Sequence, residues 1–525
     1  MTVPIADPAG IAALRADLES VGYTVDGAHD LLGPLAAAAL DREQSLPARR
    51  MLARRVREAV LPNDSRDVAR AWLIELFSLG AAIYGPALDA ALPRLGAAGA
   101  VRLGLVRPST VAGELVAAVD LRPYGDETHT WWLASDCSEL ATGAPVAPDH
   151  VLGIGGASAT LASWTPRRPV TRALDLGTGC GVQALHLATH AASVTATDLS
   201  SRAVAFARFN AALNHQDWRL LTGSMLEPVA AERFDLVVSN PPFVITPRTA
   251  DLVQFTYRDG GRVGDAIVAE LIGAAGSGVG EVLEPGGVAQ FLANWEVGDG
   301  ADWRDRVGAW VEASGLDAWV VQRELIDPAQ YAELWGRDGG HVAGSGESGA
   351  AFEAMYAAWL DDFEARGVAA IGFGVITLQR PQRARRPFVD LVEVLGPVAP
   401  VMGPVVDAGL AARTWLAEAG DAEVLARHWR PAPDVTREQH YRPGEADPAV
   451  ILLRQGGGLG LAHRLDTVDA AYVSVADGEL SADQAAVAIA AVLDADAEAV
   501  RAQVAATVRL LVRDGLLVTD ELGRA

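Results

Sequence analysis

The sequence predicts an α/β protein built around an open, mostly parallel β-sheet, and three observations support this. Seven short apolar runs alternate with amphipathic segments between residues 150 and 390. The first run ends in a glycine-rich loop, and polar side chains follow the second and fourth runs. Strands that alternate with helices form parallel sheets covered on both faces, and ligands bind where such strands end. The predicted strands are 172–176, 193–198, 218–223, 234–240, 287–293, 318–324 and 371–378.

The chain of 525 residues is long enough for several domains, and we expect three regions. Residues 1–150 and 391–525 combine predicted helices with short strand-like runs, which indicates winged-helix-like α+β modules. Between them, residues 151–390 form the α/β region, with a helical insertion at about 325–368. The predicted flanking elements are helices at 46–59, 66–80, 86–94, 481–493 and 496–513, strands at 101–107, 111–121, 128–135 and 516–519, and a hairpin around 455–460.

Composition limits the classes of protein that fit. The net charge of −24 argues against a generally basic nucleic-acid binder. The only two cysteines, Cys137 and Cys180, are typical of a reducing compartment. The first residues lack the basic and apolar stretches of a signal peptide, and no apolar run is long enough to span a bilayer. We therefore expect a soluble cytoplasmic protein with no membrane partner.

A glycine-rich loop follows the first predicted strand. Asp175-Leu176-Gly177-Thr178-Gly179-Cys180-Gly181 leads from this strand into a helix. Glycines let the chain turn tightly and let a ligand approach the backbone. About 20 residues further on, the second strand ends in Thr197-Asp198, where a carboxylate can accept hydrogen bonds from ribose hydroxyls. The spacing of loop and acid predicts a cofactor that contains adenosine.

The fourth predicted strand ends in Asn240-Pro241-Pro242-Phe243. The side-chain oxygen of Asn240 and the carbonyl of Pro241 can both accept hydrogen bonds from one –NH2 group. The lone pair of a planar amine or amide is delocalised, and two such acceptors localise it toward a methyl donor. The prolines stiffen the turn, so the acceptors are preorganised, and Phe243 offers a face to a planar group. The tetrapeptide therefore predicts a nitrogen-methylation site that works mainly by positioning.

In this order and spacing, the segments DLGTGCG, ATD and SNPPF resemble class I methyltransferases of the amino-methylating branch. The resemblance covers residues 150–300 well and 300–390 more loosely. It implies an active enzyme with a Rossmann-like sheet of seven mostly parallel strands, and S-adenosylmethionine as the cofactor. It places the cofactor against Asp175, Gly177, Thr178, Gly179, Gly181, Asp198, Leu199, Ser224, Met225 and Asn240. It places the target nitrogen against Asn240, Pro241, Pro242 and Phe243.

Other segments are similar to HemK-type glutamine methyltransferases, namely TYRDGG (256–261) and LEPGG (283–287). The chain departs from those enzymes at Phe243, where they usually have tyrosine, and at residues 223–225, where they usually have an aspartate. The flanking regions also differ from the helical module of those enzymes. Residues 151–158 (VLGIGGAS) resemble the gate that related enzymes fold over the cofactor, and a domain linker is the alternative.

We therefore expect a methyltransferase that acts on a planar amino or amide nitrogen of a macromolecule and that uses no metal. An amino group of an RNA or DNA base comes first, because Phe243 and the flanking modules favour nucleic acid. A protein glutamine amide, of a release factor or ribosomal protein, is the alternative that the DGG segment favours. A small-molecule acceptor comes next, followed by an inactive binding protein that has kept the fold.

Several weaker features have two interpretations. Arg49, Arg50, Arg54, Arg55 and Arg57 share one predicted helix and could contact phosphates, although a solvated surface is the simpler interpretation. The same alternatives apply to a second basic run, Arg380, Arg383, Arg385 and Arg386. The last helix carries Arg501, Arg509 and Arg513 behind two acids, which favours a structural or protein-binding role. His186 and His190 lie four residues apart on one predicted helix and could bind a metal, but the acid that follows the first histidine in zinc proteases is absent, so we interpret them as surface or packing residues. Trp131 and Trp132 could line a substrate surface, and packing in the core or between modules is the simpler interpretation.

Overall fold

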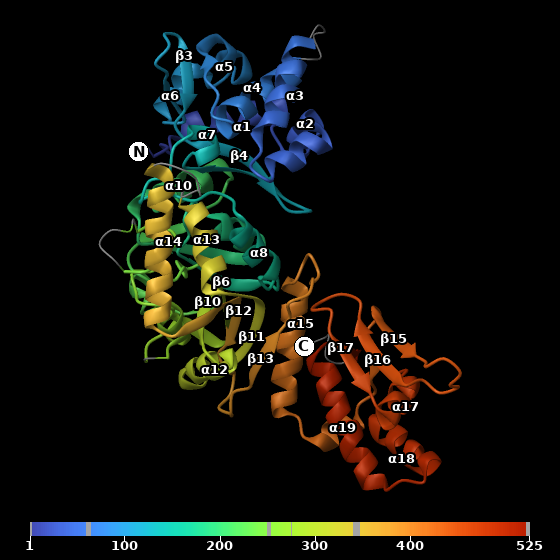
Figure 1. The fold of residues 1–525 in the computed structure, drawn as a ribbon. Helices are drawn as coiled ribbons and strands as arrows, with labels where there is room; N and C mark the ends of the chain where they lie inside the picture. The colour runs from blue at the N-terminus through green and yellow to red at the C-terminus, as the bar shows by residue number, and fades with distance from the viewer. Residues whose placement is uncertain are drawn as a thin grey trace. The chain divides into compact units, whose positions relative to one another are not determined.

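The computed structural model describes residues 3–58, 65–248, 252, 254–274, 276–339 and 347–520. The chain divides into two compact units. Unit 1 comprises residues 1–159, 169–314 and 325–373, and unit 2 comprises residues 160–168, 315–324 and 374–525. Figure 1 colours the chain from blue at its beginning to red at its end. Residue 59, the last residue of the predicted helix at 46–59, lies outside the described residues.

The central sheet has eight strands in the order β13-β11-β12-β10-β9-β6-β7-β8. From β10 through β9, β6 and β7 to β8 every neighbouring pair is parallel, as are β11 and β13. This confirms the predicted, mainly parallel sheet. The strands are β6 (Val170–Leu176), β7 (Ala191–Asp198), β8 (Arg219–Thr222), β9 (Phe234–Ser239), β10 (Leu283–Gly298), β11 (Asp317–Ile326), β12 (Val368–Gln379) and β13 (Val389–Glu393).

The prediction of seven strands was wrong by one. The unpredicted strand, β13, lies at the edge of the sheet beside β11. None of its five residues is buried, so it lacks the continuous apolar run that marks a strand covered on both faces. In contrast, the last four residues of β6 and of β9 are all buried.

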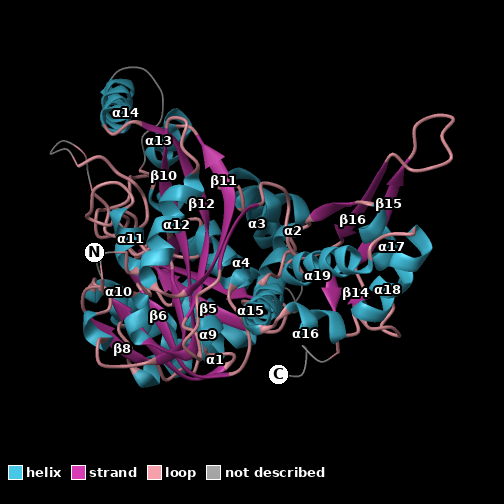
Figure 2. Cartoon of the chain, turned by 90° about the horizontal axis from the view of Figure 1, so that it is seen from below, coloured by secondary structure: helices cyan, strands magenta, loops and turns pink. Residues whose placement is uncertain are grey.

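Helices cover the sheet between successive strands. Helices α9 (Val182–Leu187) and α10 (Ser201–Leu213) pack on β6, β7 and β8, and α11 (Ala266–Ile272) and α12 (Trp303–Ser314) pack on β10. Figure 2 shows α10, α11 and α12 beside the magenta strands. The helical insertion consists of α13 (Pro328–Asp338) and α14 (Glu347–Ala365), and residues 340–346 between them lie outside the described residues.

The strand order reverses between β6 and β9. The chain runs from β6 to β7 and β8 in one direction, and then returns so that β9 pairs with the other side of β6. Such a reversal opens a crevice at the carboxyl ends of the two strands, where α/β proteins bind ligands. Leu176 and Ser239 are paired residues at these ends. The glycine loop after Leu176 and the segment that begins at Asn240 therefore start side by side.

The N-terminal region is mainly helical. Its helices are α1 (Pro8–Val21), α2 (Val25–Leu40), α3 (Ser45–Glu58), α4 (Ser65–Leu73), the π-helix η2 (Ile74–Ser78), α5 (Gly85–Ala91) and α6 (Gly96–Arg102). Strands β1 (Ile83–Tyr84), β2 (Val106–Pro108) and β3 (Glu114–Ala117) form one small sheet, and β4 (Asp120–Gly125) pairs with β5 (Thr130–Ser135). The prediction of a strand over 101–107 was largely wrong, because α6 continues to Arg102 and β2 begins at Val106. Two short helices follow, α7 (Glu139–Thr142) and α8 (Gly156–Trp164).

Asn210 of α10 and Asn214, the residue that caps the end of this helix, bind the free edge of β5. Asn210 accepts a hydrogen bond from the backbone N–H of Ala134 and donates one to its carbonyl, each at 2.8 Å. Asn214 does the same to Trp132, at 2.9 and 2.7 Å. The two carboxamides take the place of a neighbouring strand, and the N-terminal region belongs to the same compact unit as strands β6 to β10.

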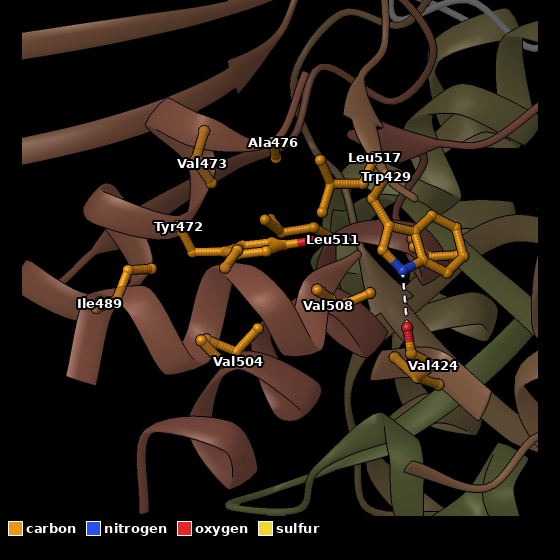
Figure 3. Packing of buried hydrophobic residues seen from close by; sticks show 14 of the residues in the cluster. Val424, Trp429, Tyr472, Val473, Ala476, Ile489, Val504, Val508, Leu511 and Leu517 are labelled. Carbon is orange, nitrogen blue, oxygen red and sulfur yellow. Dashed lines mark hydrogen bonds between the residues drawn. The ribbon is translucent and has the colours of Figure 1, made fainter. Parts of the chain in front are cut away.

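The C-terminal part of unit 2 has a core of its own. Its elements are α15 (Gly403–Glu418), α16 (Asp421–Ala426), β14 (Arg430–Pro431), β15 (Val435–His440), β16 (Val450–Gln455), β17 (Ala462–Leu465), α17 (Thr467–Val475), α18 (Ala482–Leu493), α19 (Ala497–Arg513) and β18 (Leu517–Val518). The predicted hairpin is the pair β16 and β17, and the two predicted helices are α18 and α19. Figure 3 shows Trp429 and Tyr472 packed among the aliphatic side chains of this core, where the Trp429 indole N–H donates to the Val424 carbonyl at 2.9 Å.

None of the described helices combines the length and the apolar character that a bilayer crossing requires.

Candidate active site

A cavity of about 480 Å³ opens in unit 1 at the carboxyl ends of β6, β7 and β9. This is the crevice that the strand order predicts. It is bounded on three sides by the glycine loop, by the end of β7 and by the residues that follow β9. The predicted site residues that line it are Gly177, Thr178, Gly179, Asp198, Leu199, Ser224, Met225, Asn240, Pro241 and Pro242.

Gly177 and Gly179 leave a space that any side chain would fill. Their φ angles are +75° and +56°, in the left-handed region that favours glycine. A Cβ atom built on either residue would meet no protein atom within 4 Å, so both backbones face the open cavity. This is the close backbone approach that a bound cofactor needs.

Asp175 and Gly181 do not line the cavity, in contrast to the positions expected for them. Asp175 is wholly buried, and its Oδ2 accepts hydrogen bonds from Thr178 Oγ1 at 2.6 Å and from the Ala184 backbone N–H at 2.9 Å. A Cβ on Gly181 would lie 2.7 Å from the Trp218 ring. Both residues therefore lie on the side of the glycine loop that packs against the protein, and not on the side that faces the cavity.

Burial raises the pKa of Asp175 to about 7, and the nearby Asp198 adds to the shift. Asp198 itself lines the cavity. It accepts hydrogen bonds from the backbone N–H groups of Gly179, at 2.9 Å, and Ser200, at 2.8 Å. Its pKa is also raised, mainly by burial. Each oxygen of Asp198 keeps a further lone pair, so the carboxylate can also accept a ligand hydroxyl.

The end of β8 closes another side of the cavity. The Gly223 N–H donates to the Asp198 carbonyl at 2.9 Å, which places Ser224 and Met225 beside the end of β7. Met225 has a φ angle of +46°, an uncommon value for a residue with a side chain. Leu199 is 64% exposed although it lines the cavity. These three side chains supply the wall opposite the glycine loop.

Asn240 lies where this cavity meets a second one of similar volume, about 480 Å³. Its Oδ1 is shielded from solvent and has no hydrogen-bond partner in the described part of the chain. Unsatisfied buried acceptors of this kind are rare and costly. The Pro241 carbonyl accepts a hydrogen bond from the Phe243 N–H at 2.8 Å, which leaves it one free lone pair.

Phe243 faces the second cavity and not the first. Its ring lies edge-on to Trp335, with 6.5 Å between ring centroids. Tyr257, which lines both cavities, donates a hydrogen bond to Asp338 at 2.7 Å. The remaining wall comes largely from the N-terminal region, and includes Leu40, Glu43, Asp120, Arg122, Asp136 and Ser138.

The segment at 151–158 separates the two cavities, because residues from it line both. The Val151 N–H donates to Asp136 at 2.8 Å, and Asp136 in turn forms an ion pair with Arg202 of α10. Burial lowers the pKa of the adjacent His150. A segment placed in this way can control access from one cavity to the other.

Comparison with known proteins identifies this arrangement. Residues 153–297 match the family model of the methyltransferase small domain, and residues 20–118 match a domain of unknown function (DUF7059). Residues 153–297 form a methyltransferase domain. It is of the class I type, related to HemK-type enzymes, and its cofactor is S-adenosylmethionine.

Curated relatives align with parts of this domain. A release factor glutamine methyltransferase of Deinococcus radiodurans is 41% identical over 125 residues, which cover 22% of this chain and 45% of that protein. A Bordetella pertussis protein of the same name is 38% identical over 149 residues, 27% of this chain and 54% of that protein. A tRNA1(Val) (adenine(37)-N6)-methyltransferase of Tolumonas auensis is 36% identical over 102 residues, 18% of this chain and 42% of that protein. The chain thus spans about half the length of these relatives.

The DGG segment (259–261) of the methyltransferase domain holds the residues that follow Asn240 in place through hydrogen bonds. Asp259 accepts hydrogen bonds from Thr246 Oγ1 and from the Phe255 N–H, each at 2.5 Å. The Val244 N–H donates to the Arg258 carbonyl at 3.0 Å. Burial raises the pKa of Asp259. Asp259 therefore positions the turn on which Phe243 sits.

The structure also shows the surroundings of the histidines, tryptophans and arginines that the sequence left with two interpretations. His186 is buried against Tyr124, whose hydroxyl lies 2.6 Å from its Nε2, and Trp132 is buried with its indole N–H donating to the Tyr23 carbonyl at 2.6 Å. These are packing contacts, as predicted. The last helix, α19, has its arginines paired with acids, as do parts of the run after β12, where Arg385 binds Asp317.

Sequence reasoning missed the residues of the second cavity that lie far from Asn240 in the chain. Trp335 and Asp338 belong to the insertion, and Asp120, Arg122 and Asp136 to the N-terminal region. Tyr257 was within reach, because it belongs to the TYRDGG segment. The others are single residues with no spacing pattern, so only the fold brings them to the site.

Proposed function

We propose that this chain is an S-adenosylmethionine-dependent N-methyltransferase that acts on a planar amino nitrogen, with an amino group of an RNA or DNA base as the preferred acceptor. The observation that carries the proposal is the unsatisfied Oδ1 of Asn240 at the junction of two cavities. One cavity fits the cofactor and the other fits the acceptor. A bound –NH2 group would satisfy this oxygen.

The residues of the first cavity fit the cofactor. The backbones of Gly177 and Gly179 leave room for its amino-acid and sugar portions, and Asp198 offers an acceptor to the ribose hydroxyls. When bound, S-adenosylmethionine supplies a methyl group on a positively charged sulfur, so the site needs no strong general base.

The second part of the mechanism is positioning of the acceptor. Asn240 Oδ1 and the free lone pair of the Pro241 carbonyl accept the two N–H bonds of the target amine. Its lone pair then points toward the first cavity. A sulfonium cofactor held in the first cavity would supply the methyl carbon and leave as a neutral thioether, and the proton released by the acceptor nitrogen would pass to solvent. The gate at 151–158 limits the entry of water while the two cavities are occupied.

A base is preferred as the acceptor because the second cavity is lined by aromatic rings. Phe243, Tyr257 and Trp335 all contribute to its wall, and such rings hold a flat heterocycle by stacking. We further propose that the regions on either side of the methyltransferase domain are winged-helix-like modules that recognise the substrate. We also propose that the enzyme is cytoplasmic.

A protein glutamine amide is the second candidate. The TYRDGG segment and the similarity to release factor glutamine methyltransferases favour it. A glutamine side chain also presents a flat –NH2 group and could reach Asn240 through the same cavity.

Methyl transfer into a cell extract tests the proposal and separates the two candidates. The purified chain is incubated with extract and with cofactor labelled on its methyl group, and the products are then treated with nuclease or with protease. Label released by nuclease supports a base, and label released by protease supports an amide. Label that remains in large products after both treatments contradicts the proposal. So does an Asn240→Ala variant that transfers labelled methyl groups as fast as the wild type.

A further inference from the structure

Helix α3 carries a basic stripe on its outward face. The buried side chains of α3 are Ala48 and Leu52. At about 100° per residue, Arg50, Arg54 and Arg57 project from the opposite side of the helix. All three are exposed. They span about 10 Å along the helix axis at 1.5 Å per residue.

The charge of this stripe is largely unneutralised. In the part of the chain that the structure describes, no ion pair involves Arg50 or Arg57, and Arg54 pairs with Glu58 at 2.9 Å. Both side chains of that pair are more than half exposed, and such surface pairs contribute little and dissociate easily. Residues 42–58 contain six arginines and two glutamates, in a chain whose net charge is −24.

The arginines of α19 and of the run after β12 are neutralised by acids to a greater extent than those of α3. On α19, Arg501 pairs with Asp483 and Glu498, Arg509 with Asp421, and Arg513 with Asp514. After β12, Arg385 is held by Asp317. The run after β12 is thus paired in part, with Arg383 and Arg386 exposed, whereas α3 presents three exposed arginines on one helix face.

The chain that leads into α3 lines the acceptor cavity. Leu40, the last residue of α2, and Glu43, two residues before α3 begins, both line the cavity that contains Phe243 and one side of Asn240. A polymer whose base occupies that cavity must leave it past its lining residues, and the start of α3 is among the first elements it would meet.

We propose that Arg50, Arg54 and Arg57 bind the phosphate backbone of a single-stranded nucleic acid whose base enters the acceptor cavity. The inference rests on the proposed function. A single strand fits best, because a base taken from a duplex must first be unpaired and unstacked, at a cost of a few kcal/mol. Arginine binds phosphate with a bidentate geometry, and the attraction does not depend on base sequence.

Binding of a labelled RNA to the full-length protein tests the inference. The probe is a fluorescent, unstructured RNA of about 20 nucleotides, long enough to cover the stripe and the cavity. The variant R50Q/R54Q/R57Q is compared with R437Q/R442Q/R464Q. The control replaces three exposed arginines of unit 2 and changes the net charge by the same amount. Glutamine preserves helix propensity, so α3 should remain folded.

We expect the α3 variant to lose at least tenfold in affinity, while the control changes by less than about threefold. The slope of log affinity against log salt should fall by about 2 in the α3 variant, because each lost single-strand phosphate contact contributes about 0.7. Equal losses in both variants, no loss in either, or no binding of RNA by the wild type would overturn the inference.

The two proposals fail in different ways. If the wild type methylates a protein and does not bind RNA, the α3 inference is wrong and the methyltransferase function stands. If Asn240→Ala transfers methyl groups as fast as the wild type, the proposed active site is wrong, whatever RNA binding shows. Calorimetry with S-adenosylmethionine checks that the α3 variant keeps its cofactor cavity.

Discussion

Gly179 and Gly181 lie two residues apart in one loop, yet the structure predicts opposite effects when each is replaced by alanine. In Gly179→Ala, the new methyl group enters the open cavity and meets no protein atom within 4 Å. The protein loses only the cost of a left-handed alanine, about 1 kcal/mol. In Gly181→Ala, φ is +98° and the methyl group lies 2.7 Å from the Trp218 ring. Strain and overpacking together cost about 2–5 kcal/mol.

Calorimetry of the full chain measures both effects. The unfolding transition of unit 1 is the one that S-adenosylmethionine raises. Gly181→Ala should lower the Tm of that transition by roughly 5–10 °C, whereas Gly179→Ala should lower it by only a few degrees. Titration with cofactor should show an affinity loss of tenfold or more for Gly179→Ala and a smaller loss for Gly181→Ala. If the two variants weaken cofactor binding equally at equal stability, the division of the loop into a cavity side and a packing side is wrong.

Further predictions concern four other residues. Asp198→Ala should weaken S-adenosylmethionine binding by about tenfold or more in calorimetry, because a charged hydrogen bond is lost, while the fold is kept. Asn240→Ala should slow methyl transfer by roughly 10²–10³-fold and change cofactor affinity little, as single-turnover rates and titration would show. Burial raises the folded pKa of Asp175 from 3.8 to about 7, so the wild type should lose stability relative to Asp175→Asn as pH rises between these values. A Tm difference that stays constant over this range would contradict it. Trp335→Ala should raise the KM for the acceptor and leave the cofactor Kd unchanged, and a weaker cofactor Kd would contradict the separation of the cavities.

The sheet and the cofactor cavity could be predicted because local pattern determines them. Strands buried on both faces, such as β6 and β9, appear in the sequence as continuous apolar runs. The strand ends then place the glycine loop, Asp198 and Asn240 at one edge. The spacing of a loop does not tell which of its residues face inward, and this is why Asp175 and Gly181 were assigned to the cavity although they pack behind it.

The acceptor cavity could not be predicted in the same way. Its walls join Asn240 to Asp120 and Asp136, more than a hundred residues earlier, and to Trp335 and Asp338, almost a hundred residues later. None of these residues belongs to a repeat or a fixed spacing. Their meeting depends on the packing of the N-terminal region and of the insertion against the sheet, which is long-range information. Phe243 was predicted at the site from its place beside Asn240, and the structure adds that it faces the acceptor side.

Helix α10 links the cofactor side of the site to the acceptor side. It begins directly after Asp198, because Asp198 accepts a hydrogen bond from the Ser200 N–H and the Ser200 hydroxyl caps the helix at Ala203. Further along, Arg202 pairs with Asp136, which holds the start of the gate through the Val151 N–H. Asn210 and its neighbour one turn later then bind the edge of β5. One helix therefore positions the segment at 151–158, the N-terminal wall of the second cavity and Asp198. The N-terminal region thus forms part of the wall of the candidate active site, although the family model that covers the methyltransferase domain begins only at residue 153.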